Sequence, residues 1–450
     1  MRITVSCLLI LSSCLSAQTL TDKYREPAAR LIGEAMTDRS GYQKLVWLCD
    51  RIGNRLAGTP ALNEAVRWAA EQMRKDGLTN IQTPLVKVPY WVRGNESVTL
   101  LSPVPRKLPM LGLGRSVGTP PSGITADVVV VSNFDQLEKL GRTKVQGKIV
   151  LYDAPFEGYG KTVQYRSAGP NRAANLGAVA VLVRSVASAT LRTPHTGALF
   201  YSQTGTKIPA AAITIEDSMM LHRMYDSGAE VRVQLKMEAH QLPDADSANV
   251  IAEIPGSEKP EEIVVMGGHL DSWDVGQGAQ DDGSGCVGAM QAAYLIKKLG
   301  LKPRRTIRVV LWTNEESGLA GGRAYRQWIG AKIANHVAAI EMDGGAEPPV
   351  AFDTTVKDPA AIEQLKQIAS LLGTVGAGKI AFGGPEADIS PIVADGVPGI
   401  GLRTTMEHYF DWHHTEADTV DKVNERDLQA NVASLAVMAY ILADMPDRLK

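Results

Sequence analysis

The sequence predicts an α/β protein in which a mixed, mostly parallel sheet flanked by helices carries an inserted, β-rich domain. After residue 247, strand-like and helix-like segments alternate, and such alternation is typical of a parallel sheet. Residues 119–242 differ, because short β-rich runs are separated there by Gly and Pro. The chain has 450 residues and 44% hydrophobic content, enough for a large core and for more than one structural unit.

The expected elements begin with a helix over residues 61–77, whose apolar residues recur at helical spacing and which Gly77 ends. Four short strands are expected in the insert, at 128–131, 147–152, 177–183 and 208–213. After a polar joint, we expect a strand at 263–266, a helix at 286–299 and strands at 307–313 and 337–342. A helix over 425–445, apolar on one side and polar on the other, closes the chain.

Charge and the N-terminal residues restrict the partners and the location. The 47 basic and 49 acidic residues nearly balance, and no basic run with interleaved aromatic residues indicates binding to nucleic acid. Residues 1–17 are typical of an export signal, so a periplasmic or secreted protein is expected. The apolar run there is too short to cross a bilayer, and no transmembrane helix is expected. Alternatively, Cys14 lies in a lipoprotein-like processing site and would carry a lipid anchor.

The remaining cysteines do not predict a disulfide framework. Cys49 and Cys286 are the two that follow the export signal, too few to staple a chain of this length. Cys286 falls within an Ala- and Gly-rich helical pattern, so we expect a buried structural thiol there and not a nucleophile.

Two motifs near the strand at 263–266 contain side chains that bind metals. His269 and Asp271 follow that strand, an arrangement in which an imidazole binds a cation while a carboxylate orients the ring, although the pair alone is more often a surface or capping arrangement. Asp281 and Asp282 open a Gly-rich turn before a helix, where Asp side chains also cap free amides. The capping and the metal-binding interpretations are compatible.

Three further motifs enlarge the set of candidate ligands. Glu315 and Glu316 follow the next predicted strand, Asp343 follows the one after it, and His414 lies near the C-terminus. Each has a structural explanation when taken alone, such as a solvated loop. Together, at the edge where strand ends meet, they supply two imidazoles and at least three carboxylates, a set suited to zinc, with cobalt or manganese as substitutes. The two imidazoles argue against a calcium site. The sequence therefore predicts a metal-dependent hydrolase.

In this order, the motifs resemble those of the di-zinc exopeptidase family that includes bacterial aminopeptidases, and most closely its carboxypeptidase Q (plasma glutamate carboxypeptidase) branch. The resemblance covers most of the chain after the export signal, including residues 53–58, Gly-Asn-Arg-Leu-Ala-Gly. It implies a zinc exopeptidase fold, a protease-associated domain as the insert, and two Zn²⁺ ions per chain. The implied metal ligands are His269, Asp281, Glu316, Asp343 and His414, with Asp281 bridging the ions.

The resemblance also implies roles for residues beside the ligands. Glu315 corresponds to the general base, and Asp271 to the residue that orients the first His. His414 is preferred to His413 as a ligand, because the family's His directly precedes Thr-x-x-Asp-Thr. Tyr409 is a candidate to line the substrate pocket or to stabilise an oxyanion, and packing against its aromatic neighbours explains it equally well.

The expected activity is hydrolysis of small peptides from one end, as a dipeptidase, an aminopeptidase or a carboxypeptidase. The resemblance also implies a homodimer. A glutaminyl cyclase-like enzyme and a non-catalytic binding protein on the same scaffold are the alternatives, and the intact set of ligands and base argues against both. The expected division of the chain is an export signal at 1–17, an N-terminal part of the peptidase domain at 18–118, a protease-associated insert at 119–242 and a di-zinc peptidase domain at 243–450.

Overall fold

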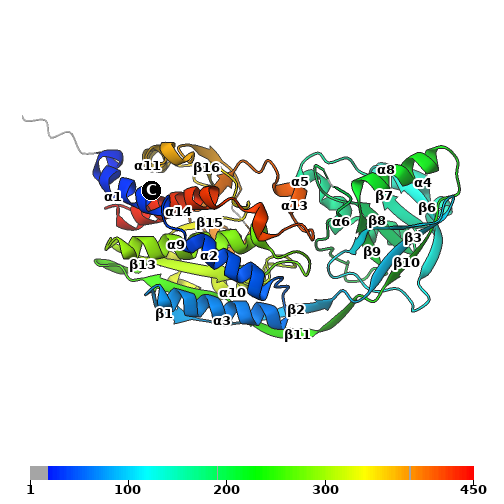
Figure 1. Ribbon diagram of the computed structural model, residues 1–450, viewed down its shortest axis with the longest axis horizontal. Coiled ribbons are helices and arrows are strands. Elements are labelled where there is room, and N and C mark those ends of the chain that lie inside the picture. The colour runs from blue at the N-terminus through cyan, green and yellow to red at the C-terminus, as the bar shows by residue number, and fades with distance from the viewer. Residues whose placement is uncertain (1–18, 190, 385–386, 450) are drawn as a thin grey trace, which may run out of the picture.

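The computed structural model describes residues 19–189, 191–384 and 387–449, so the expected export signal and Cys14 lie outside the described residues. Figure 1 shows two bodies that a narrow two-stranded ribbon joins. The larger body is built on an eight-stranded sheet, here called the first sheet. Its strands lie in the order β1 (Thr79–Gln82), β12 (Val250–Ile254), β14 (Arg305–Trp312), β13 (Lys259–His269), β15 (His336–Glu341), β18 (Gly399–Thr404), β16 (Pro349–Thr354) and β17 (Ile380–Phe382).

The centre of the first sheet is parallel. β13 pairs in parallel with β14 on one side and with β15 on the other, and β15 pairs in parallel with β18. Strands nearer the edges add antiparallel pairs, such as β12 with β14 and β16 with β18. The predicted mixed, mostly parallel sheet is therefore confirmed. Because the chain runs from β13 to β14 and then to β15 on the opposite side, β13 is a topological switch point, where open α/β sheets form a crevice.

Helices cover both faces of the first sheet. One face packs against α1 (Leu20–Ala35), α2 (Ser40–Trp47), α3 (Pro60–Lys75), α9 (Ser284–Lys298), α11 (Pro359–Ser370) and α14 (Glu425–Asp444). The other face packs against α10 (Ala320–Ile329) and α12 (Ser390–Val393). The strands are thus buried on both sides, which explains their continuous apolar sequence. Within the described part of the chain, no helix is both long and apolar enough to cross a membrane.

The last helix differs from its prediction, because α14 has no polar side. Nearly every residue from Leu428 to Ala443 is buried, whereas the charged residues Arg426 and Asp444 lie near its two ends. The reason is its position: α14 contacts α1, α9 and α11 as well as several strands of the first sheet. Only the ends of the helix reach solvent, so the polar residues that suggested an exposed face belong to the ends.

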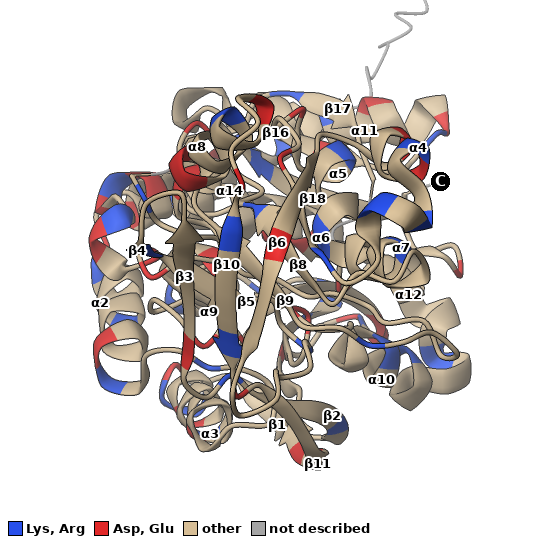
Figure 2. Ribbon diagram, turned by 90° about the vertical axis from the view of Figure 1, so that its right-hand side faces the viewer, with Lys and Arg blue, Asp and Glu red and all other residues tan. Residues whose placement is uncertain are grey.

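A second eight-stranded sheet forms the smaller body. Its order is β4 (Arg106–Leu108), β3 (Glu96–Ser102), β10 (Arg232–Met237), β6 (Ile124–Val131), β7 (Ile149–Tyr152), β8 (Ala180–Arg184), β9 (Ala210–Ile213) and β5 (Met110–Gly112). Figure 2 looks onto this end of the molecule, where β3, β10 and β6 lie side by side. The sheet begins ahead of the expected boundary at residue 119, because β3 pairs with β10 and so draws residues 96–112 into the smaller body.

The two bodies meet at a ribbon and at a set of side chains. The ribbon consists of β2 (Leu85–Val92) and β11 (His240–Ala248), which pair antiparallel. Beside it, the partly buried Arg93 lies 2.5 Å from Asp274 of the larger body and 3.3 Å from Glu96 of the smaller one. On the opposite side of the junction, Phe410 of α13 (Tyr409–Trp412) stacks on Tyr159 of α5 (Tyr159–Thr162) with ring centroids 5.3 Å apart. The smaller body is therefore held against the carboxyl edge of the first sheet.

Candidate metal centre

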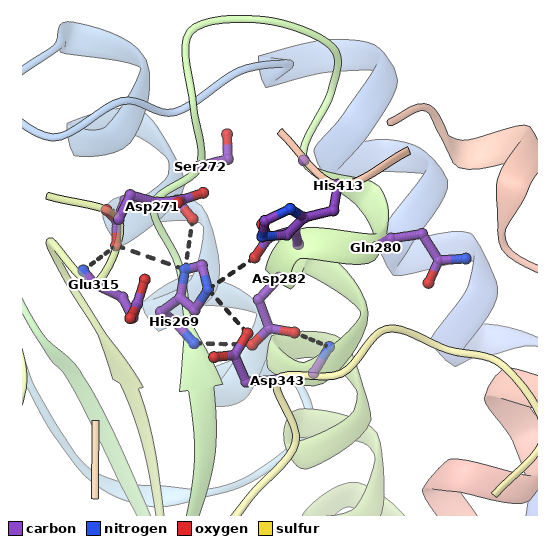
Figure 3. Close-up of polar contacts among 12 residues, drawn as sticks. His269, Asp271, Ser272, Gln280, Asp282, Glu315, Asp343 and His413 are labelled. Carbon is purple, nitrogen blue, oxygen red and sulfur yellow. Dashed lines mark hydrogen bonds and ion pairs between the residues drawn. The ribbon is translucent and has the colours of Figure 1, made fainter. Parts of the chain in front are cut away.

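Three parallel strands bring the predicted motifs to one edge of the first sheet. His269 is the last residue of β13, the pair Glu315 and Glu316 follows β14, and Asp343 lies two positions beyond β15. Because β13 lies between β14 and β15, the carboxyl ends of the three strands are adjacent. Figure 3 shows His269, Glu315 and Asp343 close together there. The crevice at the switch point is therefore lined by imidazole and carboxylate groups, as the strand-end argument predicts.

These side chains form two groups that share one carboxylate. In the first group, Nε2 of His269 lies 3.1 Å from Oδ1 of Asp281 and 3.2 Å from Oδ1 of Asp343. In the second, Nε2 of His414 lies 3.2 Å from Oδ2 of Asp281 and 3.0 Å from Oε2 of Glu316. Each oxygen of Asp281 thus faces a different imidazole. An aspartate in this position is able to bridge two cations, each completed by one His and one further carboxylate.

The electrostatics of the two groups favour bound cations. Burial raises the pKa of Glu316 well above its usual value, and the neighbouring Asp281 adds to that shift. Burial opposes the charged form of His269, but Asp343 and Asp281 outweigh it and hold the pKa of that imidazole well above its usual value. In the described part of the chain, Oε1 of Glu316 is buried without a hydrogen-bond partner. Carboxylates this close repel one another unless cations lie between them, and oxygen and imidazole donors together suit zinc.

Two adjacent imidazoles compete for the second group. The rings of His413 and His414 stack with centroids 3.5 Å apart. Nε2 of His413 is 3.6 Å from Asp281, and no second carboxylate of the described residues approaches it as Glu316 approaches His414. His414 also adopts a left-handed backbone conformation with φ 64°, which is uncommon outside glycine and concentrates at functional sites. The geometry therefore favours His414, in agreement with the motif.

Asp418 fixes the backbone that carries the shared carboxylate. Its side chain accepts hydrogen bonds from the N–H groups of Ala279, Gln280 and Asp281 at 3.1, 2.8 and 3.2 Å. It is itself buried, and burial raises its pKa to about 7. Sequence reasoning assigned no role to Asp418, although its spacing in Thr-x-x-Asp-Thr after His414 was the available signal.

Asp282 fixes the backbone at His269 and at the start of α9. Its carboxylate accepts the N–H of His269 and the N–H of Gly285, in the first turn of α9, both at 3.0 Å. A Cβ at Gly268 would lie 2.2 Å from Oδ2 of Asp282, so this close approach requires a glycine directly before His269. The capping interpretation thus applies to Asp282, which binds backbone N–H groups at the start of the helix. The metal-binding interpretation applies to Asp281, which faces the imidazoles.

Arg55 is a second residue whose role the sequence did not indicate. Its fully buried guanidinium donates to the backbone carbonyls of Gly53, Leu270, Gln277 and Gly278 at 2.7–2.9 Å. Three of these carbonyls belong to residues 270–278, the loop between His269 and the Asp pair. The guanidinium therefore satisfies the buried carbonyl groups of this loop and fixes the positions of His269 and Asp281 on either side of it.

Asp271 acts on its neighbours differently from the expectation. Nδ1 of His269 donates to the backbone carbonyl of Asp271 at 2.9 Å, whereas the carboxylate of Asp271 is 3.8 Å from that nitrogen. The carboxylate instead accepts the N–H of Glu315 at 3.0 Å. Asp271 thus orients the ring of His269 through its carbonyl and positions Glu315 through its side chain.

A cavity of 570 Å³ opens over the centre. Glu315 and Tyr409 line it, and burial raises the pKa of Glu315 to about 8. Tyr409 also packs edge-on against Phe410, so it both lines the pocket and belongs to an aromatic cluster. A larger cavity of 710 Å³ beside His336 lies at the opposite edge of the first sheet, and the structure shows no group of metal-binding side chains among its described residues. The chemistry is therefore assigned to the smaller cavity.

The fold and this centre define a metal-dependent hydrolase of the α/β class. Residues 249–439 match Peptidase family M28. Carboxypeptidase Q of Bos taurus is 43% identical to this chain over 91% of the chain and 86% of its own length. The chain belongs to peptidase family M28, and the predicted hydrolase is a peptidase.

Solved structures agree with this assignment. A peptidase M28 precursor from Shewanella amazonensis SB2B superimposes with a TM-score of 0.92 at 37% identity, covering 96% of this chain and 99% of that one. An aminopeptidase from Aneurinibacillus sp. strain AM-1 has a TM-score of 0.68 at 22% identity, covering 94% of this chain and 97% of its own, and shares the fold. The predicted α/β architecture and the predicted family are therefore confirmed.

Proposed function

We propose that this protein is a zinc-dependent exopeptidase acting on small peptides, and that it holds two Zn²⁺ ions. The observation that carries the proposal is the division of Asp281 between two groups of ligands. One ion would take His269 and Asp343, the other His414 and Glu316, and Asp281 would give one oxygen to each. Such sites leave a coordination position open for water or substrate, as catalytic zinc sites do.

The chain's own residues supply the proton transfers and the positioning. Zinc bound at the centre would act as a Lewis acid toward the scissile carbonyl and toward a water molecule. Glu315 lines the cavity above the ligands and would accept the proton of the attacking water, then return it to the departing amine. Because burial raises the pKa of Glu315 to about 8, its carboxylate is a stronger proton acceptor than an exposed one. Asp271 holds Glu315 in place through its backbone N–H.

Small peptides with one free end are the proposed substrates. The cavity of 570 Å³ fits a short peptide and lies where the smaller body faces the first sheet. Relatives named carboxypeptidase Q, which are 40–43% identical to this chain, support an exopeptidase over a cyclase or a binding protein. The complete set of five proposed ligands together with Glu315 supports the same choice. The choice of substrate distinguishes dipeptidase, aminopeptidase and carboxypeptidase activity.

The test uses a panel of unblocked dipeptides, N-blocked dipeptides and aminoacyl anilides. The purified protein is assayed after zinc loading, after chelation and after zinc is restored. We expect cleavage that disappears with the metal and returns with it, and the blocked substrates identify the terminus that is recognised. A folded, zinc-loaded protein that cleaves none of these substrates would contradict the proposal and favour the binding protein.

Three further predictions concern the whole protein. We propose that the smaller body is a protease-associated domain, that the chain is exported through residues 1–17, and that it forms a homodimer. Sequencing the N-terminus of the mature protein distinguishes cleavage after Ala17 from processing at Cys14, and light scattering gives the oligomeric state.

A further inference from the structure

The smaller body places one cationic side chain in the wall of the metal-site cavity. Arg166 lies on α6 (Gln164–Ser167), and its side chain lines the cavity together with Tyr159 and Phe200, which also come from the smaller body. The residue is only 5% exposed. The opposite wall is made by the larger body and carries four of the five proposed ligands, Asp281, Glu316, Asp343 and His414. The guanidinium is therefore a positive charge that the smaller body contributes to the site.

The guanidinium is held in place by neutral groups. Its Nη1 atom donates to the backbone carbonyl of Thr196 at 3.2 Å, and its Nη2 atom donates to the hydroxyl of Tyr159 at 2.7 Å. A Cβ at Gly197 would lie 2.2 Å from Nη1, so the side chain rests directly on the glycine backbone. Tyr159 is in turn fixed by stacking on Phe410. These contacts orient the side chain and leave its charge uncompensated.

No carboxylate of the described residues lies within ion-pair distance of Arg166, and its Nε atom is buried without a hydrogen-bond partner. A buried, unpaired cation is costly, because desolvation is not offset by an opposite charge. Elsewhere in the smaller body the partly buried Arg184 does have a carboxylate partner, Asp153, at 3.2 Å. An anion that enters the cavity would supply the negatively charged partner that Arg166 lacks.

The position of Arg166 relative to His414 indicates which anionic group of a substrate would pair with it. Its Nη1 atom is 3.3 Å from Nδ1 of His414, whose other ring nitrogen faces Glu316 and Asp281. The guanidinium therefore lies one imidazole ring away from the proposed reaction centre. One residue of extended chain spans about 3.5 Å, so a carboxylate at this place belongs to the residue that directly follows the scissile bond. Arginine binds carboxylates with strong, charge-assisted hydrogen bonds.

We propose that Arg166 binds the free α-carboxylate of the residue after the scissile bond, so that the enzyme selects dipeptides and other substrates that lose a single C-terminal residue. The inference rests on the proposed peptidase function and specifies its substrate. Selection then depends on the smaller body, because that body supplies Arg166, its Tyr159 partner and the glycine beneath it.

The test compares a dipeptide with the same dipeptide carrying a C-terminal amide. For Arg166→Gln, we expect kcat/KM to fall about 10- to 100-fold with the free acid, as loss of a hydrogen bond between charged groups implies, and less than about threefold with the amide. Arg166→Lys should retain part of the preference for the acid. Gly197→Ala, which displaces the guanidinium, should reduce the preference as Arg166→Gln does. Equal losses on both substrates, or no loss on the acid, would overturn the proposal.

Two controls separate this proposal from the proposed function. Arg172→Gln removes an exposed arginine of the same body that pairs with Glu138, and it should leave both substrates unaffected. Binding of the uncleaved dipeptide acid to Glu315→Gln, measured by calorimetry, should weaken by the same factor when Arg166→Gln is added. If the unsubstituted protein cleaves neither substrate, the peptidase function fails, whereas calorimetry still decides whether Arg166 binds the carboxylate.

Discussion

The two sheets both carry a buried polar cluster at the carboxyl ends of parallel strands, yet the clusters differ in how their charges are matched. In the second sheet, Asp153 follows β7 and lies 3.2 Å from Nη1 of Arg184. It also accepts the hydroxyl of Ser218 on α8 (Ile215–Asp226) at 2.8 Å and lies 2.6 Å from Nδ1 of His222. Both oxygens of this carboxylate have partners within the protein.

In the first sheet, carboxylates outnumber the groups that could pair with them. Oε1 of Glu316 and Oδ2 of Asp271 are buried without hydrogen-bond partners among the described residues. Since buried polar groups are nearly always satisfied, those that are not call for an explanation such as a bound ion. Both clusters contain Asp and His side chains, so composition does not distinguish them. What distinguishes the first cluster is therefore its buried carboxylate oxygens without partners, since both oxygens of Asp153 are paired.

The largest expected difference between the two clusters is in their response to the same substitution, Asp→Asn. Asp281→Asn removes the charge that both proposed groups share, so we expect peptidase activity to fall by more than about 10³-fold, with loss of bound zinc. Asp153→Asn should leave turnover unchanged but lower the free energy of unfolding by about 3 kcal/mol, because Arg184 loses its buried partner. Kinetics, metal analysis and urea unfolding measure these effects. Similar activities for the two variants would remove the distinction between the clusters.

A second substitution tests the proton transfer without disturbing the ligands. Glu315→Gln keeps the shape of the side chain and should lower kcat by about 10²- to 10⁴-fold, as loss of a general base does. The zinc content and the melting temperature should stay close to those of the unsubstituted protein, because Glu315 is not one of the proposed ligands. An active Glu315→Gln variant would show that another group moves the proton.

A third contrast separates the two adjacent imidazoles. His414→Gln should weaken zinc binding and lower activity by at least about 100-fold, because His414 faces both Asp281 and Glu316. His413→Gln should cost about tenfold or less, since that ring mainly packs among aromatic side chains. Zinc affinity measured by competition with a chelator gives the comparison. The reverse order would assign the ligand to His413.

The smallest expected effect concerns His336, at the edge of the first sheet opposite the centre. Burial lowers the pKa of His336 from 6.5 to about 4, and its ring is bonded to Tyr325 and to the carbonyl of Lys332. The unfolded chain therefore binds a proton below pH 6.5 that the folded protein does not. The contribution of neutral His336 to the free energy of unfolding is therefore fully present above pH 6.5 and decreases toward pH 4. At pH 5 it is lower by about 2 kcal/mol.

The variant His336→Gln should lack this part of the pH dependence. Urea unfolding at pH 7 and pH 5 compares it with the unsubstituted protein, so that the shared contributions of other groups cancel. An identical change in stability between the two pH values for both proteins would show that His336 is not held neutral in the fold.

Much of the centre could be predicted because it follows strand ends. The apolar runs that became β13, β14 and β15 are each followed directly by His269, by Glu315 and Glu316, or by Asp343. Parallel strands bring such positions to one edge whatever the rest of the fold does. The order of the strands in the sheet was not needed for this inference.

The rest depends on contacts between distant segments. His414 follows no strand, and its backbone is held by Thr196 of the smaller body, whose N–H donates to the carbonyl of His414 at 3.0 Å. Arg55 and Asp418 act on backbone groups more than a hundred residues away. No local sequence pattern predicts contacts between residues so far apart in the chain. The misjudged α14 has the same cause, because periodicity does not show how many neighbours surround a helix.

The most direct test of the account is an anomalous difference map from a crystal of the zinc-loaded protein, recorded at the zinc absorption edge. We expect two peaks on either side of Asp281, one beside His269 and Asp343 and the other beside His414 and Glu316. A single peak, or peaks away from Asp281, would contradict the shared carboxylate on which the proposed centre depends.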